Sequence, residues 1–514
     1  MELNNTARDG AELRPAGWGM IAALVGSLGA LLLVSIIVGG LLVTAPGLGG
    51  LVALGVPLGA VLLVLAFRPA TQRYALLGLF ALAPSTGLMK VVSGQRYGPL
   101  LFDLLLVVVL AVVILSGRSR FPAAGLWVLL LLALAALEMI HPNIPSFGLA
   151  LEGFHKFMFL GLAFFVAQGA FIDRKFLRQF SALLIIQATI LALYGIKQFM
   201  LPSDFDWRLI GFSEPGADIS FTVAGHLRAF ATTSGPFHLG IYLASTIVLG
   251  VALWPLVRRW WRWGLAAALL IMTLGLGFTI TKANWVGAVA GVGVVLLLGG
   301  GLRRVKRFLP VLAIVGAVLL FAVLPAIIAV DPNGAVAVGL RDVLNPTRAQ
   351  TFILRAASWQ QVIVPAILEH PWLGYGTGAA GEGVQHNVIA AGGLGFYSHS
   401  LYFKILLEMG VLGLVAFLAL MGTVLWRGRQ IQARIRDPFL RAMLLWCLGY
   451  AVAMLVSCIA GPMLDAYPAN MLFWFALGLV SRIWLLDRQG AAMPAPVPTP
   501  EAAPRAAPGA VPAS

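Results

Sequence analysis

The chain has 514 residues, of which 60% are hydrophobic and only 11% charged, and its formal net charge is +15. This apolar fraction exceeds what the core of a soluble protein can hide, so the composition excludes a soluble globular domain and indicates a polytopic membrane protein. Because a bilayer offers no partner to backbone amides, the sequence predicts an all-α helical bundle. Most of the excess positive charge lies in short loops whose charge membrane topology explains, so we expect no nucleic-acid partner.

Apolar runs of about 20 residues, long enough to cross a bilayer, recur along the chain. They predict about 12–14 transmembrane helices. The runs begin near Gly17, Leu48, Tyr74, Leu100, Pro122, Gly153, Phe176, Gly235, Trp263, Asn284, Phe308, Phe396, Pro438 and Ala469. Arginine and lysine clusters occupy every second loop, so the positive-inside rule makes those loops and both termini cytoplasmic. Two longer polar loops then face outward.

The runs and loops divide the chain into six predicted parts. They are a cytoplasmic N-terminal segment at 1–16, a transmembrane scaffold at 17–199, transmembrane helices with an outward polar loop (200–235) at 200–330, a large periplasmic loop with a surface helix at 331–397, C-terminal transmembrane helices at 398–486, and a disordered cytoplasmic tail at 487–514. The tail is rich in Ala and Pro, a composition that does not form a packed core.

The large outward loop contains one predicted helix. Asn345-Pro346 is typical of a cap followed by a first-turn proline, and the helix runs to about Glu369. Arg348 and Arg355 are seven residues apart and therefore share one face of this helix. Two readings remain open: the arginines bind an anion, or they edge an amphipathic helix that rests on the membrane surface.

His399 is the strongest candidate for chemistry. Ser398 is a suitable helix cap, which places His399 in the first turn of an apolar helix at the outer boundary between water and lipid. The helix N-terminus favours an anion and opposes a second positive charge on the imidazole. A neutral His399 can then accept a proton from a hydroxyl. A histidine that faces lipid headgroups is the alternative.

Arg228 closes the first outward loop. The next span begins at Gly235-Pro236, a helix-start signature, and carries His238. His238 either lines a cavity beneath Arg228 or forms a buried hydrogen bond. An interfacial arginine that extends to the lipid headgroups is the alternative for Arg228.

Lys282 lies at an outward turn between two apolar runs. The predicted topology puts it on the same side as Arg228, Arg348, Arg355 and His399. Several cations and one base on one side of the membrane predict a site for a pyrophosphate group.

Two further residues of the helix after His399 are expected to support the site. They are Tyr402 and Glu408. Glu408 should lie about 13 Å along the helix from His399, deeper in the bundle. It pairs there with one of the outward cations or with Lys404, one turn above it.

Metal and cofactor sites find no support in the sequence. The chain has no His-x-x-x-His, Asp-x-Asp or carboxylate cluster at ligand spacing, so we expect no metal. Cys447 and Cys458 fall in one predicted span, where they are packing residues and form neither a disulfide nor a thiolate cluster.

Four segments between Arg228 and about Gly413 resemble the O-antigen ligase and O-antigen polymerase superfamily, membrane glycosyltransferases that act on undecaprenyl-diphosphate-linked glycans. In chain order they are LRAFATTSGPFHLGIYLA, TITKANWVGA, RAASWQQVIVPAILEHPWLGYGTG and SHSLYFKILLEMGVLGL. Their order, spacing and outward placement carry the resemblance. The chain departs from the family pattern at Ser400, where the family usually has Asn, and at Lys282-Ala283, near the usual Arg-Gly.

The resemblance implies a GT-C-like bundle and an inverting, metal-independent glycosyl transfer without a cofactor. His399 would activate a sugar hydroxyl of the acceptor, while Arg228 and Arg355 would hold the diphosphate leaving group. The donor would be an undecaprenyl-diphosphate-linked oligosaccharide, and the acceptor an O-antigen or exopolysaccharide glycan or the lipid A core. The protein would lie in the bacterial inner membrane, with its active site periplasmic. Polymerases, ligases and protein-glycosylating relatives share this donor chemistry, and the sequence does not separate them.

A transporter or flippase of lipid-linked glycans would also need cations and about twelve to fourteen spans. Transporters often contain internal repeats with broken helices at matching positions, and this sequence shows no such symmetry. A non-enzymatic scaffold gives the outward cations no reason to cluster. The sequence therefore favours an enzyme.

Overall fold

The computed structural model describes residues 71–88, 106–107, 109–111, 122–169, 171–210, 221–223, 225–300, 350–381 and 384–492, together with isolated positions between 334 and 349. Within these ranges regular structure is almost entirely helical. A short antiparallel hairpin pairs β1 (Thr222–Val223) with β2 (His226–Leu227). The predicted all-α class is confirmed.

Six helices of the described ranges are long and apolar enough to cross a membrane. They are α9 (Arg174–Met200), α12 (Pro236–Leu253), α13 (Arg259–Phe278), α21 (Leu401–Gln432), α22 (Pro438–Ser457) and α23 (Ala469–Ala492). The chain is therefore a multi-pass membrane protein, as its composition predicts.

Shorter elements complete the bundle. The shorter elements that pack beside the long helices or continue them are α3 (Gln72–Leu82), η1 (Ala83–Ser85), α6 (Gly125–Leu137), η2 (Glu138–Ile140), α7 (Phe147–Phe157), η3 (Phe159–Leu162), α8 (Ala163–Val166), η4 (Trp254–Leu256) and α14 (Lys282–Leu298). Those in the connections are α10 (Asp204–Ile210), α18 (Gln350–Ser358), the π-helical turn η7 (Trp359–Ile363), α19 (Val364–Glu369), α20 (Gln385–Ala390) and η8 (Met463–Asp465). The span expected near Gly153 is a broken pair, α7 with η3 and α8, bent by 45°.

The predicted spans compare well with the helices where both exist. α22 begins at Pro438 and α23 at Ala469, as expected, whereas α21 begins at Leu401 rather than near Phe396. The starts expected near Gly17, Leu48, Leu100 and Phe308, like the N-terminal segment at 1–16, lie outside the described residues. α23 continues to Ala492, so the first residues of the predicted disordered tail are helical.

Small residues bring α14 against α22. A Cβ added at Gly287 would stand 2.6 Å from the carbonyl oxygen of Ala453, and one at Gly291 would stand 2.6 Å from that of Gly449. Gly287 and Gly291 are four residues apart on one face of α14, the spacing that lets membrane helices approach closely. These contacts draw the helix that begins at Lys282 into the bundle.

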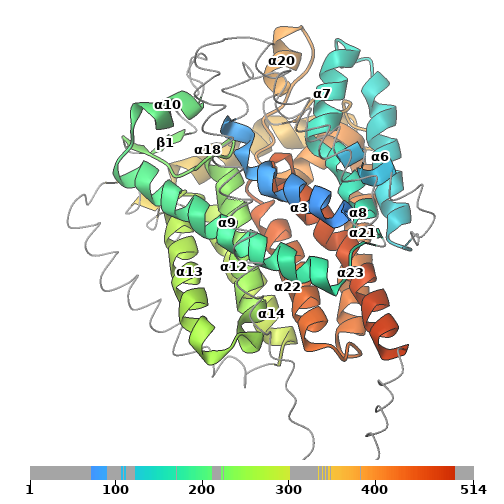
Figure 1. Ribbon diagram of the computed structural model, residues 1–514. Helices are drawn as coiled ribbons and strands as arrows, with labels where there is room; N and C mark the ends of the chain where they lie inside the picture. The colour runs from blue at the N-terminus through green and yellow to red at the C-terminus, as the bar shows by residue number, and fades with distance from the viewer. Residues whose placement is uncertain are drawn as a thin grey trace, which may run out of the picture.

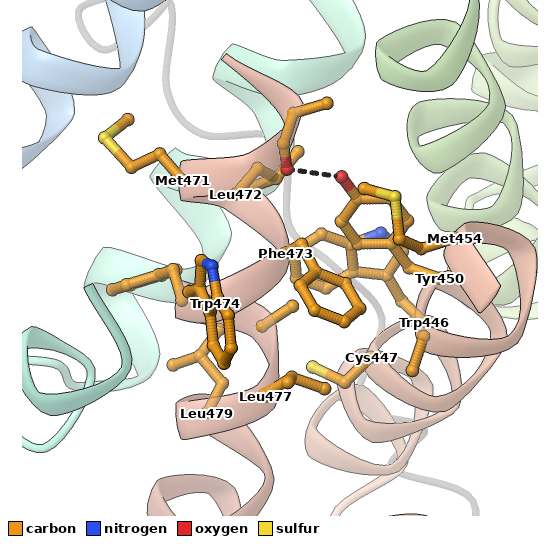
Figure 2. Packing of buried hydrophobic residues seen from close by; sticks show 14 of the residues in the cluster. Trp446, Cys447, Tyr450, Met454, Met471, Leu472, Phe473, Trp474, Leu477 and Leu479 are labelled. Carbon is orange, nitrogen blue, oxygen red and sulfur yellow. Dashed lines mark hydrogen bonds between the residues drawn. The ribbon is translucent and has the colours of Figure 1, made fainter. Parts of the chain in front are cut away.

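Large aromatic side chains fill the interface between α22 and α23 (Figure 2). Trp446 stacks on Tyr450, whose hydroxyl donates a 2.6 Å hydrogen bond to the carbonyl of Ala469. Cys447 lies in this cluster and Cys458 follows α22; both are buried free thiols, which agrees with the expected packing role. Large apolar side chains thus pack α22 against α23.

The connecting elements gather at one end of the bundle. α10, β1, α18 and α20 lie together at the upper end in Figure 1, which we call the loop end. α12 and α21 begin at this end, and both run toward the opposite end, where η4 and the α21–α22 connection lie. The residues expected to do chemistry belong to the loop end.

Candidate functional site

A small cavity at the loop end brings together segments that are far apart in the sequence. Arg355 from α18, His399 just before α21 and Phe237 from the first turn of α12 line it, together with residues 460–463 between α22 and α23. The prediction that Arg355 and His399 lie close together at the loop end is therefore consistent with the geometry.

His399 does not occupy the first turn of its helix. The helix begins at Leu401, and the capping position belongs to Ser400, whose side chain makes no cap hydrogen bond. The expectation that Ser398 caps the helix was wrong, because the chain turns at His399, whose φ is +49°. The carbonyl of Ser398 instead accepts a 2.8 Å hydrogen bond from the indole N–H of Trp359.

This left-handed backbone is unusual for a residue with a side chain. Among the described residues, the only non-glycine positions with positive φ are Ala231, Ile280 and His399. Such conformations cost about 1–3 kcal/mol each and tend to collect at functional sites. Ala231 lies three residues after Arg228, and the carbonyl of Ile280 contacts Arg228, so all three strained positions adjoin candidate site residues.

The surroundings of His399 keep its imidazole neutral. Burial lowers the pKa of His399 below its usual value of 6.5, and the positive charge of Arg355 lowers it further. A neutral imidazole is the form that accepts a proton. The side chain is half-buried at the cavity, so it remains within reach of a substrate.

Arg355 is held against the far wall of the cavity. Its Nη1 donates a 2.9 Å hydrogen bond to the carbonyl of Ala460. Its helix begins at Gln350 rather than at Asn345-Pro346, and Ala349 before it makes no side-chain cap. The helical course then continues through η7 and α19 to Glu369, the end that the sequence predicts.

The same helix exposes apolar side chains. Phe352, Ile353 and Leu354 are 42%, 51% and 62% exposed. These exposed apolar side chains suit a helix that rests on the membrane surface, while Arg355 lines the cavity. The two alternatives for this helix, anion binding through an arginine and an amphipathic helix on the membrane surface, are therefore compatible.

Arg228 lies behind the cavity wall. Its side chain is only 6% exposed, and its Nε donates to the carbonyl of Thr279 at 2.9 Å and its Nη2 to that of Ile280 at 3.3 Å. The guanidinium lies 5.0 Å from the ring centre of Phe237. Burial, with a contribution from the charge of Arg355, lowers the pKa of Arg228 to about 10. A buried arginine bonded in this way does not extend to the lipid headgroups, so that alternative was wrong.

Gln198 on α9 fixes the loop that carries Arg228. Its side-chain oxygen accepts hydrogen bonds from the amides of Phe230 at 3.2 Å and Ala231 at 2.6 Å, and its amide group donates to the carbonyl of Ala231 at 3.0 Å. Gln198 is not among the site residues expected from the sequence, because a glutamine within an apolar span carries no signal of its partner.

Lys282 follows the turn whose carbonyl groups bind Arg228, but it has a partner of its own. It opens α14, two residues after Ile280, and its ammonium group forms an ion pair with the carboxylate of Asp342. Arg348, the remaining predicted diphosphate contact, lies outside the described residues. Lys282 is not among the residues that line the cavity.

The supporting residues hold the surrounding helices together. The hydroxyl of Tyr402 donates a 2.8 Å hydrogen bond to the carbonyl of Leu455, which ties α21 to α22. His238 follows Phe237 in the first turn of α12 and is half-buried. Neither side chain lines the cavity.

Glu408 binds a glycine-rich loop rather than one of the cations that were expected to hold the diphosphate. Its Oε1 accepts hydrogen bonds from the amides of Gly378 and Ala380, each at 3.1 Å. Its Oε2 lies 3.9 Å from the ammonium group of Lys404, which is the pairing that the sequence offered as an alternative. Lys404 lies 2.6 Å from both carboxylate oxygens of Asp465.

The helix also breaks where this loop packs. Gly410, two residues after Glu408, has a φ of +61°, and a Cβ there would collide with the carbonyl of Trp372. The amide of Val411 donates to the carbonyl of Pro371 at 2.8 Å, and the amide of Tyr375 donates to that of Leu407 at 2.6 Å. The Glu-Met-Gly sequence thus joins the loop to α21 below His399.

A family model described as O-antigen ligase matches residues 267–418. The matched segment contains Lys282, Arg355, His399 and Glu408, whereas Arg228 precedes it. None of the curated proteins compared with the chain is significantly similar to it. The match supports a glycosyltransferase of the O-antigen ligase or polymerase type, acting in a membrane. Residues 267–418 thus match the O-antigen ligase family, and three of the four resembling sequence segments lie within this match.

Proposed function

We propose that the protein transfers a glycan from an undecaprenyl-diphosphate-linked donor to a sugar hydroxyl of an acceptor, without a metal and with inversion of the anomeric carbon. The observation that carries the proposal is the cavity shared by Arg355 and His399, a cation and a neutral base within the matched segment. The reaction takes place at the periplasmic face of the bacterial inner membrane, with both termini in the cytoplasm.

In this reaction His399 is the general base. The acceptor hydroxyl gives its proton to the imidazole as its oxygen bonds to the anomeric carbon of the donor. The bond between that carbon and the diphosphate oxygen breaks, and undecaprenyl diphosphate leaves with the electron pair. Attack opposite the leaving group inverts the anomeric carbon. General-base assistance of this kind contributes about 10²–10⁴ in rate.

Arg355 and Arg228 stabilise the leaving diphosphate. Burial lowers the pKa of Arg228 most, and the positive charge of Arg355 lowers it further, so the two cations repel each other. A diphosphate bound at the cavity relieves this repulsion and receives charge-assisted hydrogen bonds. Since Arg228 is bonded to two backbone carbonyls, it needs no reorganisation to act at the moment of bond cleavage.

The other residues predicted for the site have different roles in the proposed reaction. Arg348, which lies outside the described residues, is kept as a proposed diphosphate contact. Lys282 contributes mainly to the positive field, since Asp342 already binds its charge. Glu408, Tyr402 and His238 keep the elements around the cavity in place.

The test is a reaction with purified full-length protein and a synthetic undecaprenyl-diphosphate oligosaccharide, with products sized by mass spectrometry. Transfer without added metal and with inverted linkage is the expected result. A ladder of long products identifies a polymerase; a single transfer onto the lipid A core or onto a protein identifies a ligase or a protein-glycosylating enzyme. Lipid movement between leaflets without any transfer would instead identify a transporter or flippase and overturn the proposal.

Arg355 gives a sharper variant test. Arg355→Gln should weaken donor binding and slow product formation. Arg208→Gln is the matched control, because Arg208 is an exposed arginine of α10 at the same end of the bundle and does not line the cavity. Equal loss in both variants would show that general charge, and not the cavity, attracts the donor.

A further inference from the structure

A second cavity lies at the end of the bundle opposite His399. Leu256 of η4, Arg436 of the α21–α22 connection, and Arg441 and Leu445 of α22 are among the residues that line it. Its lining therefore combines two arginines with apolar side chains. The proposed glycosyl transfer uses none of these residues.

The two arginines of this cavity lack a carboxylate partner within the described part of the chain. Asp437 forms an ion pair with Arg174 and caps α22, where its Oδ1 accepts the amides of Phe439 at 2.8 Å and Leu440 at 3.1 Å. The carboxylate of Asp437 is thus already bonded to other groups. No ion pair between described residues involves Arg436 or Arg441.

Asp487 of α23 is occupied as well. Its carboxylate accepts the backbone amide of Arg436 at 3.2 Å and that of Asp437 at 3.0 Å. These bonds fix the connection between α21 and α22 without neutralising the Arg436 guanidinium. The Nε of Arg441 is buried and has no hydrogen-bond partner among the described residues. A buried guanidinium N–H without an acceptor costs about 1–3 kcal/mol, so the cavity is suited to an anion.

Tryptophans mark the membrane boundary beside this cavity. Trp260, Trp261 and Trp263, in the first turns of α13, are 85%, 48% and 75% exposed. Such residues sit at headgroup depth in membrane proteins. Arg262 donates through its Nε to the carbonyl of Val257 at 2.9 Å, which holds this belt close to Leu256.

We propose that this cavity binds the phosphate of an anionic phospholipid. The phosphate accepts hydrogen bonds from Arg441 and Arg436, and the glycerol and upper acyl carbons lie against Leu256 and Leu445. Basic pockets between transmembrane helices are suited to acidic lipid headgroups. The apolar wall and the neighbouring tryptophans favour a lipid over free phosphate, since free phosphate gains nothing from them.

The experiment is native mass spectrometry of delipidated full-length protein titrated separately with phosphatidylglycerol, phosphatidylcholine and inorganic phosphate. The wild type should bind phosphatidylglycerol in preference to phosphatidylcholine. Arg436→Gln with Arg441→Gln should weaken phosphatidylglycerol binding at least about tenfold, since removing even one charge-assisted hydrogen bond weakens binding by roughly that factor. The matched control is Arg427→Gln with Arg429→Gln, which removes two exposed charges from the same end of α21 and should change binding less than about twofold.

Several outcomes would overturn this proposal. They are equal binding of the two lipids, equal weakening by the control pair, and inorganic phosphate binding as tightly as phosphatidylglycerol. Arg436→Gln alone provides a second variant, because Arg436 is exposed and its replacement leaves the core packing intact. It should weaken binding while the melting temperature without lipid stays unchanged. Wild-type affinity in this variant would exclude Arg436 from the site.

Discussion

Arg355 and His399 line one cavity, and the charge of Arg355 helps to lower the pKa of the His399 imidazole. The two residues come from different elements, a connecting helix and the approach to a membrane span. A cation beside a neutral base explains how one site can both hold an anionic leaving group and accept a proton.

The first prediction concerns pH. If neutral His399 is the base, kcat/KM should fall as the pH drops through the pKa of His399, which lies below 6.5. Arg355→Gln removes a positive charge that disfavours the imidazolium, so the pKa should rise and the acidic limb should move to higher pH. Profiles between about pH 5 and 8 would show this shift. A limb that stays in place in the variant would mean that another group titrates.

The second prediction concerns Arg228. Arg228→Lys keeps a positive charge but removes the planar guanidinium that donates to two carbonyls. Product formation should fall by up to the equivalent of about 3 kcal/mol in the transition state. The measurement is single-turnover transfer with saturating donor. Full activity in the lysine variant would show that the reaction needs only the positive charge of Arg228 and not its planar guanidinium.

The third prediction separates Lys282 from Arg355. Because Asp342 binds the ammonium group of Lys282, Lys282→Gln should lower donor affinity less than Arg355→Gln does. Asp342→Asn should then free the lysine, with donor affinity equal to or above that of the wild type. Donor titrations of the three variants test this order. A larger effect of Lys282→Gln would place the ammonium group in the diphosphate site.

The fourth prediction concerns the break in α21. Gly410→Ala should destabilise the protein, because its φ is +61° and the new Cβ would meet the carbonyl of Trp372. Gly422→Ala in the same helix is the control, since a Cβ there meets nothing within 4 Å. It should stabilise the helix by about 0.5–1 kcal/mol. Thermal unfolding of both variants in detergent gives the comparison, and similar melting temperatures would argue against the described packing of the loop.

The fifth prediction concerns Glu408. Glu408→Ala leaves the amides of Gly378 and Ala380 without their acceptor, and each unsatisfied buried group costs about 1–3 kcal/mol. The glycine-rich loop should become more accessible to protease. Donor binding should decline only as far as the fold does, since Glu408 does not line the cavity. A stably folded variant that fails to bind the donor would give Glu408 a direct role in the site.

Much of this architecture follows from the sequence. Apolar runs predict α22 from Pro438 and α23 from Ala469 because spanning length and hydropathy are local properties. The grouping of Arg355 with His399 also follows, because the positive-inside rule assigns both to one side of the bundle.

Other features depend on tertiary packing that no local pattern encodes. The cavity wall at residues 460–463 lies between two spans, and only packing brings it to Arg355. Ser398 has the composition of a cap, yet the turn at His399 moves the helix start to Leu401. Lys282 finds Asp342 sixty residues later in the sequence, a pairing that spacing cannot predict.

The most direct measurement is the comparison of donor binding and product formation in His399→Ala protein. Purified wild type and variant are each titrated with the synthetic undecaprenyl-diphosphate oligosaccharide and then given acceptor in a single turnover. We expect the variant to bind the donor with nearly wild-type affinity and to form product at least about 10²-fold more slowly. Product formation at the wild-type rate would contradict the assignment of His399 as the base.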